Sequence, residues 1–115
     1  IPNKEFKMNN EKIYISAPIS GYDLTERKAL FSQIEDILAE EGYKPVNPFN
    51  NPLPDSAPYT EHLKQDIKLL LDCDGMVRPS RWRISKGCEI EARIAEACGI
   101  PIIGTIEDDG TLNIY

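Results

Sequence analysis

The 115-residue sequence has few of the residues on which several common kinds of site depend. It contains one histidine, His62, and three cysteines, Cys73, Cys88 and Cys98, none of them in C-x-x-C spacing. Histidine clusters and paired cysteines are the usual signs of a zinc site or a disulfide framework, so we expect no metal and no disulfides. A Ser-His-Asp triad would have to use His62. The few cysteines favour a reducing, cytoplasmic environment, and carboxylates are the best candidates for chemistry.

Long apolar runs and an excess of positive charge are also absent. No apolar run approaches the ~18 residues of a membrane-spanning helix, and we see no signal-peptide pattern, so no membrane partner is expected. The 13 Lys and Arg against 19 Asp and Glu give a formal net charge of -6. Nucleic-acid-binding surfaces are normally basic, so this composition argues against general nucleic-acid binding.

The length fits one domain of ordinary globular composition. Residues 1–11 are polar and without periodicity, and Met8 has the position of a natural start. We therefore expect a disordered arm or a cloning remnant over residues 1–11, ahead of a single domain over residues 12–115.

The domain alternates between two periodicities. Runs rich in β-branched and aromatic residues, typical of buried strands, alternate with stretches in which apolar residues recur every three or four positions, as on a helix. The expected strands are 12–17, 43–46, 75–78, 100–105 and, after the turn signal Asp109-Gly110, 111–115. The expected helices are 23–41, 59–73 and 86–98. This order predicts an α/β fold, with a sheet of four or five parallel strands and helices on both faces.

Parallel sheets of this kind bind ligands beyond the carboxyl ends of their strands, at the point where the strand order reverses. Three segments are expected there: 16–21, the proline-rich loop 47–58, and 78–87. The loop 47–58 is long enough to cover a site.

Two carboxylates stand on the apolar sides of their predicted helices. Glu91 falls opposite the charged stripe that includes Glu89, and Asp66 falls between the angular positions of Leu70 and Cys73. One inward carboxylate is explained equally well by a cap or an ion pair. Two of them, each close to the carboxyl end of a predicted strand, indicate a site where carboxylates act as nucleophile, acid or base.

The segment 75–88 carries four basic side chains and no acid. They are Arg78, Arg81, Arg83 and Lys86. A solvated surface would explain this run. The alternative is an anion site at the start of the third helix, where Ser85 would cap the helix and Gly87 would let a phosphate approach. Trp82 would either stack on a base or cover the edge of the core.

The turn after the first strand reads Ser16-Ala17-Pro18-Ile19-Ser20-Gly21. It is neither a G-x-G-x-x-G loop nor a Walker loop, and small residues in such a turn are a weak signal. Tyr14, on the preceding strand, is expected in the core with its hydroxyl group hydrogen-bonded.

Taken together, these residues make the chain resemble the nucleoside 2-deoxyribosyltransferase-like superfamily. The resemblance is greatest to its small bacterial and phage branch, related to the 2′-deoxynucleoside 5′-phosphate N-hydrolases. It spans residues 12–103 and rests on three motifs. They are K-I-Y-I-S-A-P-I-S-G from Lys12, D-I-K-x-L-L-D-C-D from Asp66, and W-x-x-S-K-G-C-x-x-E from Trp82 to Glu91.

The resemblance implies a flavodoxin-like three-layer fold and cleavage, by hydrolysis or transfer, of the N-glycosidic bond of a nucleoside or its 5′-monophosphate, without a cofactor. It implies that Glu91 attacks the anomeric carbon, that Asp66 assists at the base and that Tyr14 orients the nucleophile. The implied substrate-binding residues are Ser16, Ala17, Pro18, Ile19, Ser20, Gly21, Ser85 and Gly87, to which we add Trp82. Relatives complete their sites across a subunit interface, which implies a homodimer or larger homo-oligomer.

The turn departs from the hydrolases, because Ser20 stands at an arginine position and Pro18 replaces a hydroxyl residue. A 5′-phosphate would then depend on a basic residue of the segment 75–88. Two other functions stay open. One is a non-catalytic module that binds or senses a nucleotide, and the weaker one is a TIR-like NAD hydrolase.

Overall fold

The structure is a computed structural model that describes residues 11–115. The arm expected over residues 1–11 therefore lies, apart from Glu11, outside the described residues.

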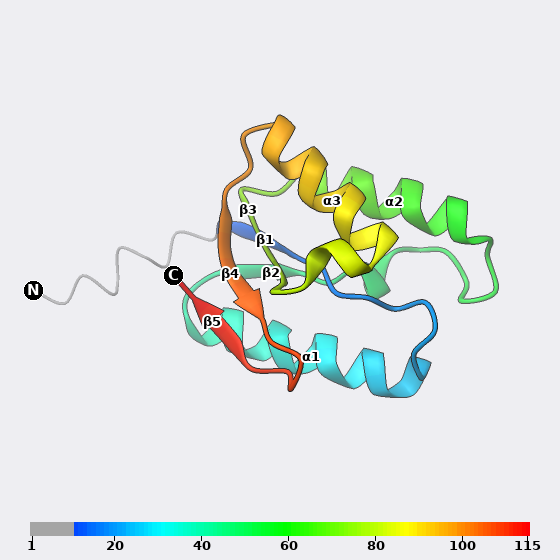
Figure 1. Ribbon diagram of the computed structural model, residues 1–115, viewed down its shortest axis with the longest axis horizontal. Coiled ribbons are helices and arrows are strands. Elements are labelled where there is room, and N and C mark those ends of the chain that lie inside the picture. The colour runs from blue at the N-terminus through cyan, green and yellow to red at the C-terminus, as the bar shows by residue number, and fades with distance from the viewer. Residues whose placement is uncertain (1–10) are drawn as a thin grey trace, which may run out of the picture.

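A five-stranded sheet with the order β2-β1-β3-β4-β5 forms the middle of the molecule (Figure 1). The strands are β1 Lys12–Ile15, β2 Lys44–Val46, β3 Gly75–Pro79, β4 Ile102–Ile106 and β5 Leu112–Ile114. From β1 the chain first moves to β2 on one side, then crosses back to β3 on the other. This is the flavodoxin-like order, and its switch point lies between β1 and β3. The predicted α/β class is confirmed.

Helices cover both faces of the sheet, with α1 on one face and α2 and α3 on the other (Figure 1). The helices are α1 Leu24–Glu40, α2 Tyr59–Leu71 and α3 Lys86–Ala97, and two 3-10 turns, η2 Pro48–Asn50 and η3 Trp82–Ile84, interrupt the loops. Each expected helix is present with ends within two residues of its predicted ends. None of the helices within residues 11–115 is long and apolar enough to cross a membrane.

The alternation of side chains along β1 divides the core in two. Ile13 and Ile15 pack with Phe31 and other residues of α1, whereas Tyr14 packs with Leu70 on the opposite face. Because successive strand residues point to opposite faces, a residue two positions after Tyr14 points to the α2–α3 side as well. This alternation places Tyr14 and Ser16 on the same face as α3.

The last strand differs from the parallel arrangement that we expected. β5 pairs with β4 in the antiparallel sense, with Thr105 opposite Asn113. The connection is a short turn in which Gly110 has a φ of 89°, a value that favours glycine. A parallel return would need a crossover of a dozen or more residues, and the chain has no such segment between these strands. The sheet therefore has four parallel strands and one antiparallel edge strand.

Candidate active site

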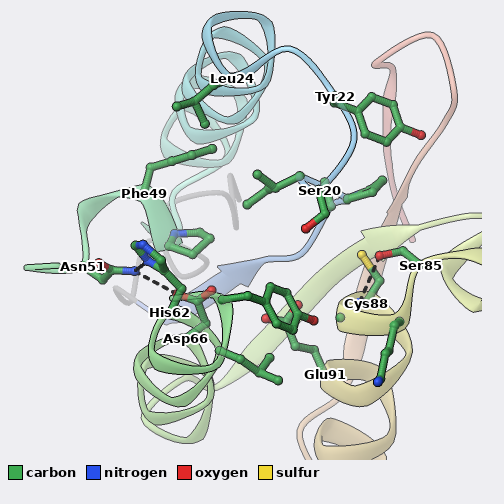
Figure 2. Close-up of a pocket in the computed structure, with 18 of the residues that line it drawn as sticks. Ser20, Tyr22, Leu24, Phe49, Asn51, His62, Asp66, Ser85, Cys88 and Glu91 are labelled. Carbon is green, nitrogen blue, oxygen red and sulfur yellow. Dashed lines mark hydrogen bonds between the residues drawn. The ribbon is translucent and has the colours of Figure 1, made fainter. Parts of the chain in front are cut away.

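A cavity of about 650 Å³ opens where β1 and β3 end, at the switch point of the sheet. Its walls come from the turn after β1, the loop after β2, helix α2 and the first turns of α3 (Figure 2). This volume is within the range of roughly 300–1,000 Å³ that is usual for small-molecule sites. Both predicted carboxylates, Glu91 and Asp66, line the cavity.

Glu91 is 6% exposed and belongs to the buried stripe of α3. Its Oε2 accepts a hydrogen bond from the Tyr14 hydroxyl group at 2.6 Å, and its Oε1 accepts one from Ser16 Oγ at 2.7 Å. Ser16 is itself fixed, because its backbone N–H donates to the Val77 carbonyl oxygen at 3.0 Å. The predictions that Glu91 turns inward and that the hydroxyl group of Tyr14 has a partner in the core are confirmed. Both oxygens of the carboxylate are held by the end of β1.

Burial raises the pKa of Glu91 to about 7, although the hydrogen bonds from Tyr14 and Ser16 act in the opposite direction. The charge of Asp66 raises this pKa further. Burial, followed by the charge of Glu91, also raises the pKa of Tyr14 well above its usual range. Tyr14 therefore stays protonated and can serve as a donor to Glu91 across the physiological pH range.

Asp66 lies on α2 at another wall of the cavity and is partly buried. Its Oδ1 accepts a hydrogen bond from Asn51 Nδ2 at 3.2 Å. Burial raises the pKa of Asp66 to about 6, against the lowering effects of the Asn51 hydrogen bond and of His62. The cavity thus combines two carboxyl groups that both titrate close to neutral pH.

Asn51 and His62 line the cavity, but the sequence did not single them out as part of this site. Asn51 belongs to the proline-rich loop, where one polar residue among many carries no signal. His62 is the only histidine, which is a weak signal, and its Nδ1 lies 3.2 Å from Asn51 Nδ2. Tyr59 was also missed. Its hydroxyl oxygen would lie 3.2 Å from a Cβ atom added at Gly87, so a side chain at position 87 would crowd this wall.

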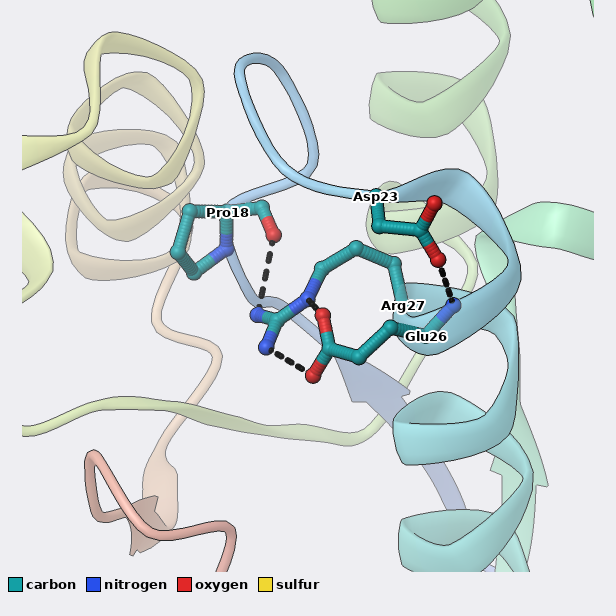
Figure 3. A network of polar contacts seen from close by, with 4 residues as sticks. All are labelled: Pro18, Asp23, Glu26 and Arg27. Atoms are coloured by element: carbon teal, nitrogen blue, oxygen red, sulfur yellow. Dashed lines mark hydrogen bonds and ion pairs between the residues drawn. The ribbon is translucent and has the colours of Figure 1, made fainter.

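The turn after β1 contributes Ala17, Pro18, Ile19 and Ser20 to the cavity wall, whereas Gly21 does not line it. Figure 3 shows how the turn is held from its other side: Arg27 Nη1 donates to the Pro18 carbonyl oxygen at 3.3 Å. The same guanidinium group pairs with Glu26 at 2.7 Å, and the side chain of Arg27 is 11% exposed. Asp23 begins α1 by accepting from the Glu26 N–H at 2.9 Å.

At the start of α3, Ser85, Lys86 and Gly87 also line the cavity. Ser85 caps the helix, as predicted, because its Oγ accepts from the Cys88 N–H. Cys88 lies behind this cap and is buried. Backbone N–H groups at a helix start are well suited to bind an anion, and Lys86 adds a positive charge beside them.

The other basic residues of the segment 75–88 do not line the cavity. The guanidinium carbons of Arg78 and Arg83 lie 4.5 and 4.7 Å from the centre of the Trp82 ring, and Arg81 pairs with Asp108 at 3.0 Å. Trp82 packs against the cluster of Leu70 and its neighbours instead of facing the cavity. Of the two roles left open for Trp82, the structure shows the covering of the core edge. Of the four basic residues, it brings only Lys86 to the cavity.

Metal ligands are not grouped at this site. Across residues 11–115, no three or more His, Cys, Asp or Glu side chains lie together in a way that could hold a metal ion. What the cavity offers is a buried carboxylate with both oxygens fixed, a second carboxyl group on a different wall and a helix start suited to an anion. This combination can perform nucleophilic and acid–base chemistry on a small molecule.

The comparisons with known proteins agree with this architecture. Residues 11–104 match a family described as a domain of unknown function (DUF4406). No match was found among curated proteins. Among solved structures, the chain is similar to the CMP N-glycosidase BcmB of Clostridium botulinum, with 22% identity and a TM-score of 0.52. The similarity covers 80% of this chain and 66% of the other, just under two thirds, and at this identity it shows a shared fold.

Proposed function

This chain belongs to the DUF4406 family, and from its site we propose that it cleaves the N-glycosidic bond of a nucleoside or its 5′-monophosphate. The observation that carries the proposal is the Glu91 carboxylate, buried in the cavity and held on both oxygens by Tyr14 and Ser16. A fixed carboxylate is what a glycosyl-transfer reaction needs to trap an oxocarbenium-like centre. The shared fold with an enzyme named as a CMP N-glycosidase supports the same class of reaction.

In the first step, an oxygen of ionised Glu91 attacks the anomeric carbon C1′ of the sugar. The bond from C1′ to the base nitrogen breaks, and its electron pair leaves with the base. Protonated Asp66 transfers its proton to the departing base and becomes a carboxylate. The step yields a glycosyl ester of Glu91 and a neutral base.

In the second step, water attacks C1′ and the ester bond to Glu91 breaks, which returns its electron pair to the Glu91 carboxylate. The Asp66 carboxylate takes the proton that the water loses, so both carboxyl groups regain their starting states. When the nitrogen of a second base replaces water, the same step becomes transfer. Tyr14 and Ser16 keep Glu91 in place throughout.

The protonation states limit the reaction to a narrow pH range. The reactive form has one negative charge on the pair, with Glu91 ionised and Asp66 protonated. The form with the proton exchanged has the same total charge, so the ratio of the two forms does not change with pH. The pKa values of about 7 for Glu91 and about 6 for Asp66 make the form with one charge most abundant between these values. We therefore expect a bell-shaped rate profile with its maximum in that interval.

A 5′-monophosphate is the substrate that best uses the start of α3. Lys86, the cap residue Ser85 and the backbone of Gly87 lie together at one wall of the cavity. They offer a positive charge and N–H groups to a phosphate. The apolar side chains of the turn after β1 would contact the sugar. A homo-oligomer, implied by the resemblance, stays a prediction.

The test compares the wild-type protein with Glu91→Gln on a panel of ribo- and deoxyribonucleosides and their 5′-monophosphates. Free base is measured by chromatography. We expect base release to fall by about 10³-fold or more in the variant, because the amide cannot attack C1′. Glu89→Gln is the matched control, since Glu89 is on the same helix but pairs with Arg93 at the surface. Equal base release by Glu91→Gln and the wild type would refute the proposal.

The same panel separates the two other functions. A nucleotide that raises the melting temperature of the wild-type protein while no base appears would support a binding or sensing module. Release of nicotinamide from NAD, with no cleavage of the other nucleotides, would support a NAD hydrolase.

A further inference from the structure

The side-chain amide of Asn51 makes polar contacts through both its nitrogen and its oxygen. Its Nδ2 donates to Asp66 Oδ1 at 3.2 Å and lies 3.2 Å from His62 Nδ1, and its Oδ1 accepts from the Leu53 N–H at 2.9 Å. His62 is fixed in turn, because its Nε2–H donates to the Pro54 carbonyl oxygen at 3.0 Å. An amide turned by 180° would set its oxygen against the Asp66 carboxylate and its N–H groups against the Leu53 N–H, so one orientation is strongly preferred.

This network joins two segments that are separate in the sequence. Asn51, Leu53 and Pro54 belong to the loop after β2, whereas His62 and Asp66 are one turn apart on α2. Figure 2 shows the amide between the two side chains of the helix, at the wall of the cavity opposite Ser85. The loop therefore reaches the candidate acid of the site through one side chain.

We propose that Asn51 is a positioning residue for Asp66, whose Oδ1 it holds so that Oδ2 is the oxygen that meets the base of a bound nucleotide. What Asp66 does there rests on the proposed function, whereas the way Asp66 is held rests on the contacts alone. Within residues 11–115, the hydrogen bond from Asn51 is the one that the Asp66 carboxylate receives. Oδ2 is therefore the oxygen left for a ligand.

The Asn51 N–H group is also placed to stabilise the negative charge that appears on Asp66 during bond cleavage. As the bond to C1′ breaks, the proton on Oδ2 of Asp66 passes to the base, and the carboxyl group becomes negative. The N–H of Asn51 already points at Oδ1, so it stabilises this charge without rearrangement. Burial acts in the other direction and raises the pKa of Asp66, and the Asn51 bond limits that rise. Asn51 thus sets how readily Asp66 releases its proton.

Other titratable groups act on Asp66 from three elements. Glu91 of α3, Tyr14 of β1, and Tyr59 and His62 of α2 all interact with it electrostatically. A substitution of Asn51 leaves these four groups in the chain. A change in the Asp66 titration between variants therefore reports the loss of the amide.

The experiment follows the side-chain carboxyl ¹³C signal of Asp66 by NMR as a function of pH, in the ligand-free protein. In Asn51→Ala the midpoint should rise by about 1 pH unit, because the carboxylate loses its donor. In Asn51→Asp it should rise further. The new carboxylate still accepts from the Leu53 N–H, but it brings a like charge next to Asp66.

Asn47→Ala is the matched control. Asn47 is a polar residue of the same loop whose Oδ1 accepts from the Phe49 N–H at 2.9 Å, and it does not line the cavity. Its loss should loosen the loop but leave the Asp66 midpoint in place. An unchanged midpoint in Asn51→Ala, or an equal rise in Asn47→Ala, would overturn the proposal.

A kinetic measurement gives the second readout. Asn51→Ala should lower kcat by about 10-fold and shift the acid limb of the rate profile, which follows the lower pKa of the pair, to higher pH, with little effect on KM. A change confined to KM would assign Asn51 to substrate binding and overturn the positioning role. If the wild-type protein cleaves no nucleotide, the proposed function fails, while the NMR titration still decides how Asp66 is held.

Discussion

The two carboxyl groups of the cavity are held by very different parts of the molecule. Glu91 is fixed by Tyr14 and Ser16, which belong to a central strand and its first following residue. Asp66 is fixed by Asn51, which belongs to a long loop at the surface. Residues at the end of a buried strand have little freedom to move, whereas loops open at a low free-energy cost. In the proposed reaction, the carboxylate that attacks is therefore held from the sheet, and the carboxyl group that handles the proton is held from the loop.

The largest expected effect is on stability, because burying the ionised Glu91 carboxylate costs free energy. Its pKa is raised from 4.5 to about 7 in the folded protein, so the folded state holds its proton more tightly than the unfolded state does. Protonation of Glu91 therefore adds to the free energy of unfolding. This contribution is complete below pH 4.5 and is lost as the pH rises through about 7. Glu91→Gln should therefore be more stable than the wild type at pH 8 by about 3 kcal/mol, and the difference should shrink towards pH 4.5. Urea unfolding at both pH values measures it, and an equal difference at both would contradict it.

Replacing Tyr14, the residue of β1 whose hydroxyl group donates to Glu91, by phenylalanine should lower kcat/KM by about 100-fold. In Tyr14→Phe, Glu91 loses a hydrogen bond that favours its ionised form, so its pKa rises further above that of Asp66. The alkaline limb of the rate profile, which follows the higher of the two pKa values, therefore moves to higher pH. Tyr43→Phe is the control, since Tyr43 packs against the other core cluster. An unchanged alkaline limb in Tyr14→Phe would show that the strand does not set the ionisation of Glu91.

Replacing Asp66, the candidate acid, should lower the rate of base release less than replacing Tyr14 lowers kcat/KM. Asp66→Asn keeps the shape of the side chain but cannot donate a carboxyl proton, and we expect base release to fall by about 30-fold. The fall of the rate at high pH should disappear, which leaves a single rise with its midpoint at the pKa of Glu91, about 7. Asp72→Asn, which affects an ion pair with Lys12 at the far end of α2, is the control. A variant that keeps both limbs would remove Asp66 from the proton transfer.

The smallest effect separates Lys86, which lines the cavity, from Arg81, which does not. Lys86→Ala should raise KM for a 5′-monophosphate by about 10-fold and leave KM for the matching nucleoside unchanged. Arg81→Ala breaks an exposed ion pair with Asp108, so both KM values should stay the same and stability should change by less than about 1 kcal/mol. Equal effects of the two variants would mean that the whole basic segment attracts the phosphate.

Much of the fold was predictable from local patterns. Runs rich in β-branched and aromatic residues identified the strands, apolar residues three or four positions apart identified the helices, and Ser85 marked the start of α3. The antiparallel sense of β5 was not predicted, although the turn signal at Asp109-Gly110 was recognised. The direction of an edge strand depends on the length of its connection as well as on its own pattern.

The candidate site was predictable in part, and the two predicted carboxylates show why. Glu91 and Asp66 break the helical pattern of their own segments, so each is visible in the sequence as a polar residue on an apolar face. Asn51 breaks no pattern, because polar residues are ordinary in a loop. Trp82 was expected at the substrate as one of two alternatives, yet the stacking of Arg78 and Arg83 around it depends on how η3 folds back onto the core.

The sequence by itself determined which residues form strands and helices, which carboxylates turn inward and where α3 begins. These features follow from periodicity and capping, which act over a few neighbouring residues. The resemblance implied that Tyr14 orients Glu91. Only the tertiary structure decided that Tyr14 and Ser16, 75 or more positions away, each hold one oxygen of Glu91, and that one loop amide joins His62 to Asp66. Such contacts depend on strand order and on the path of a loop, and no short stretch of sequence records either one.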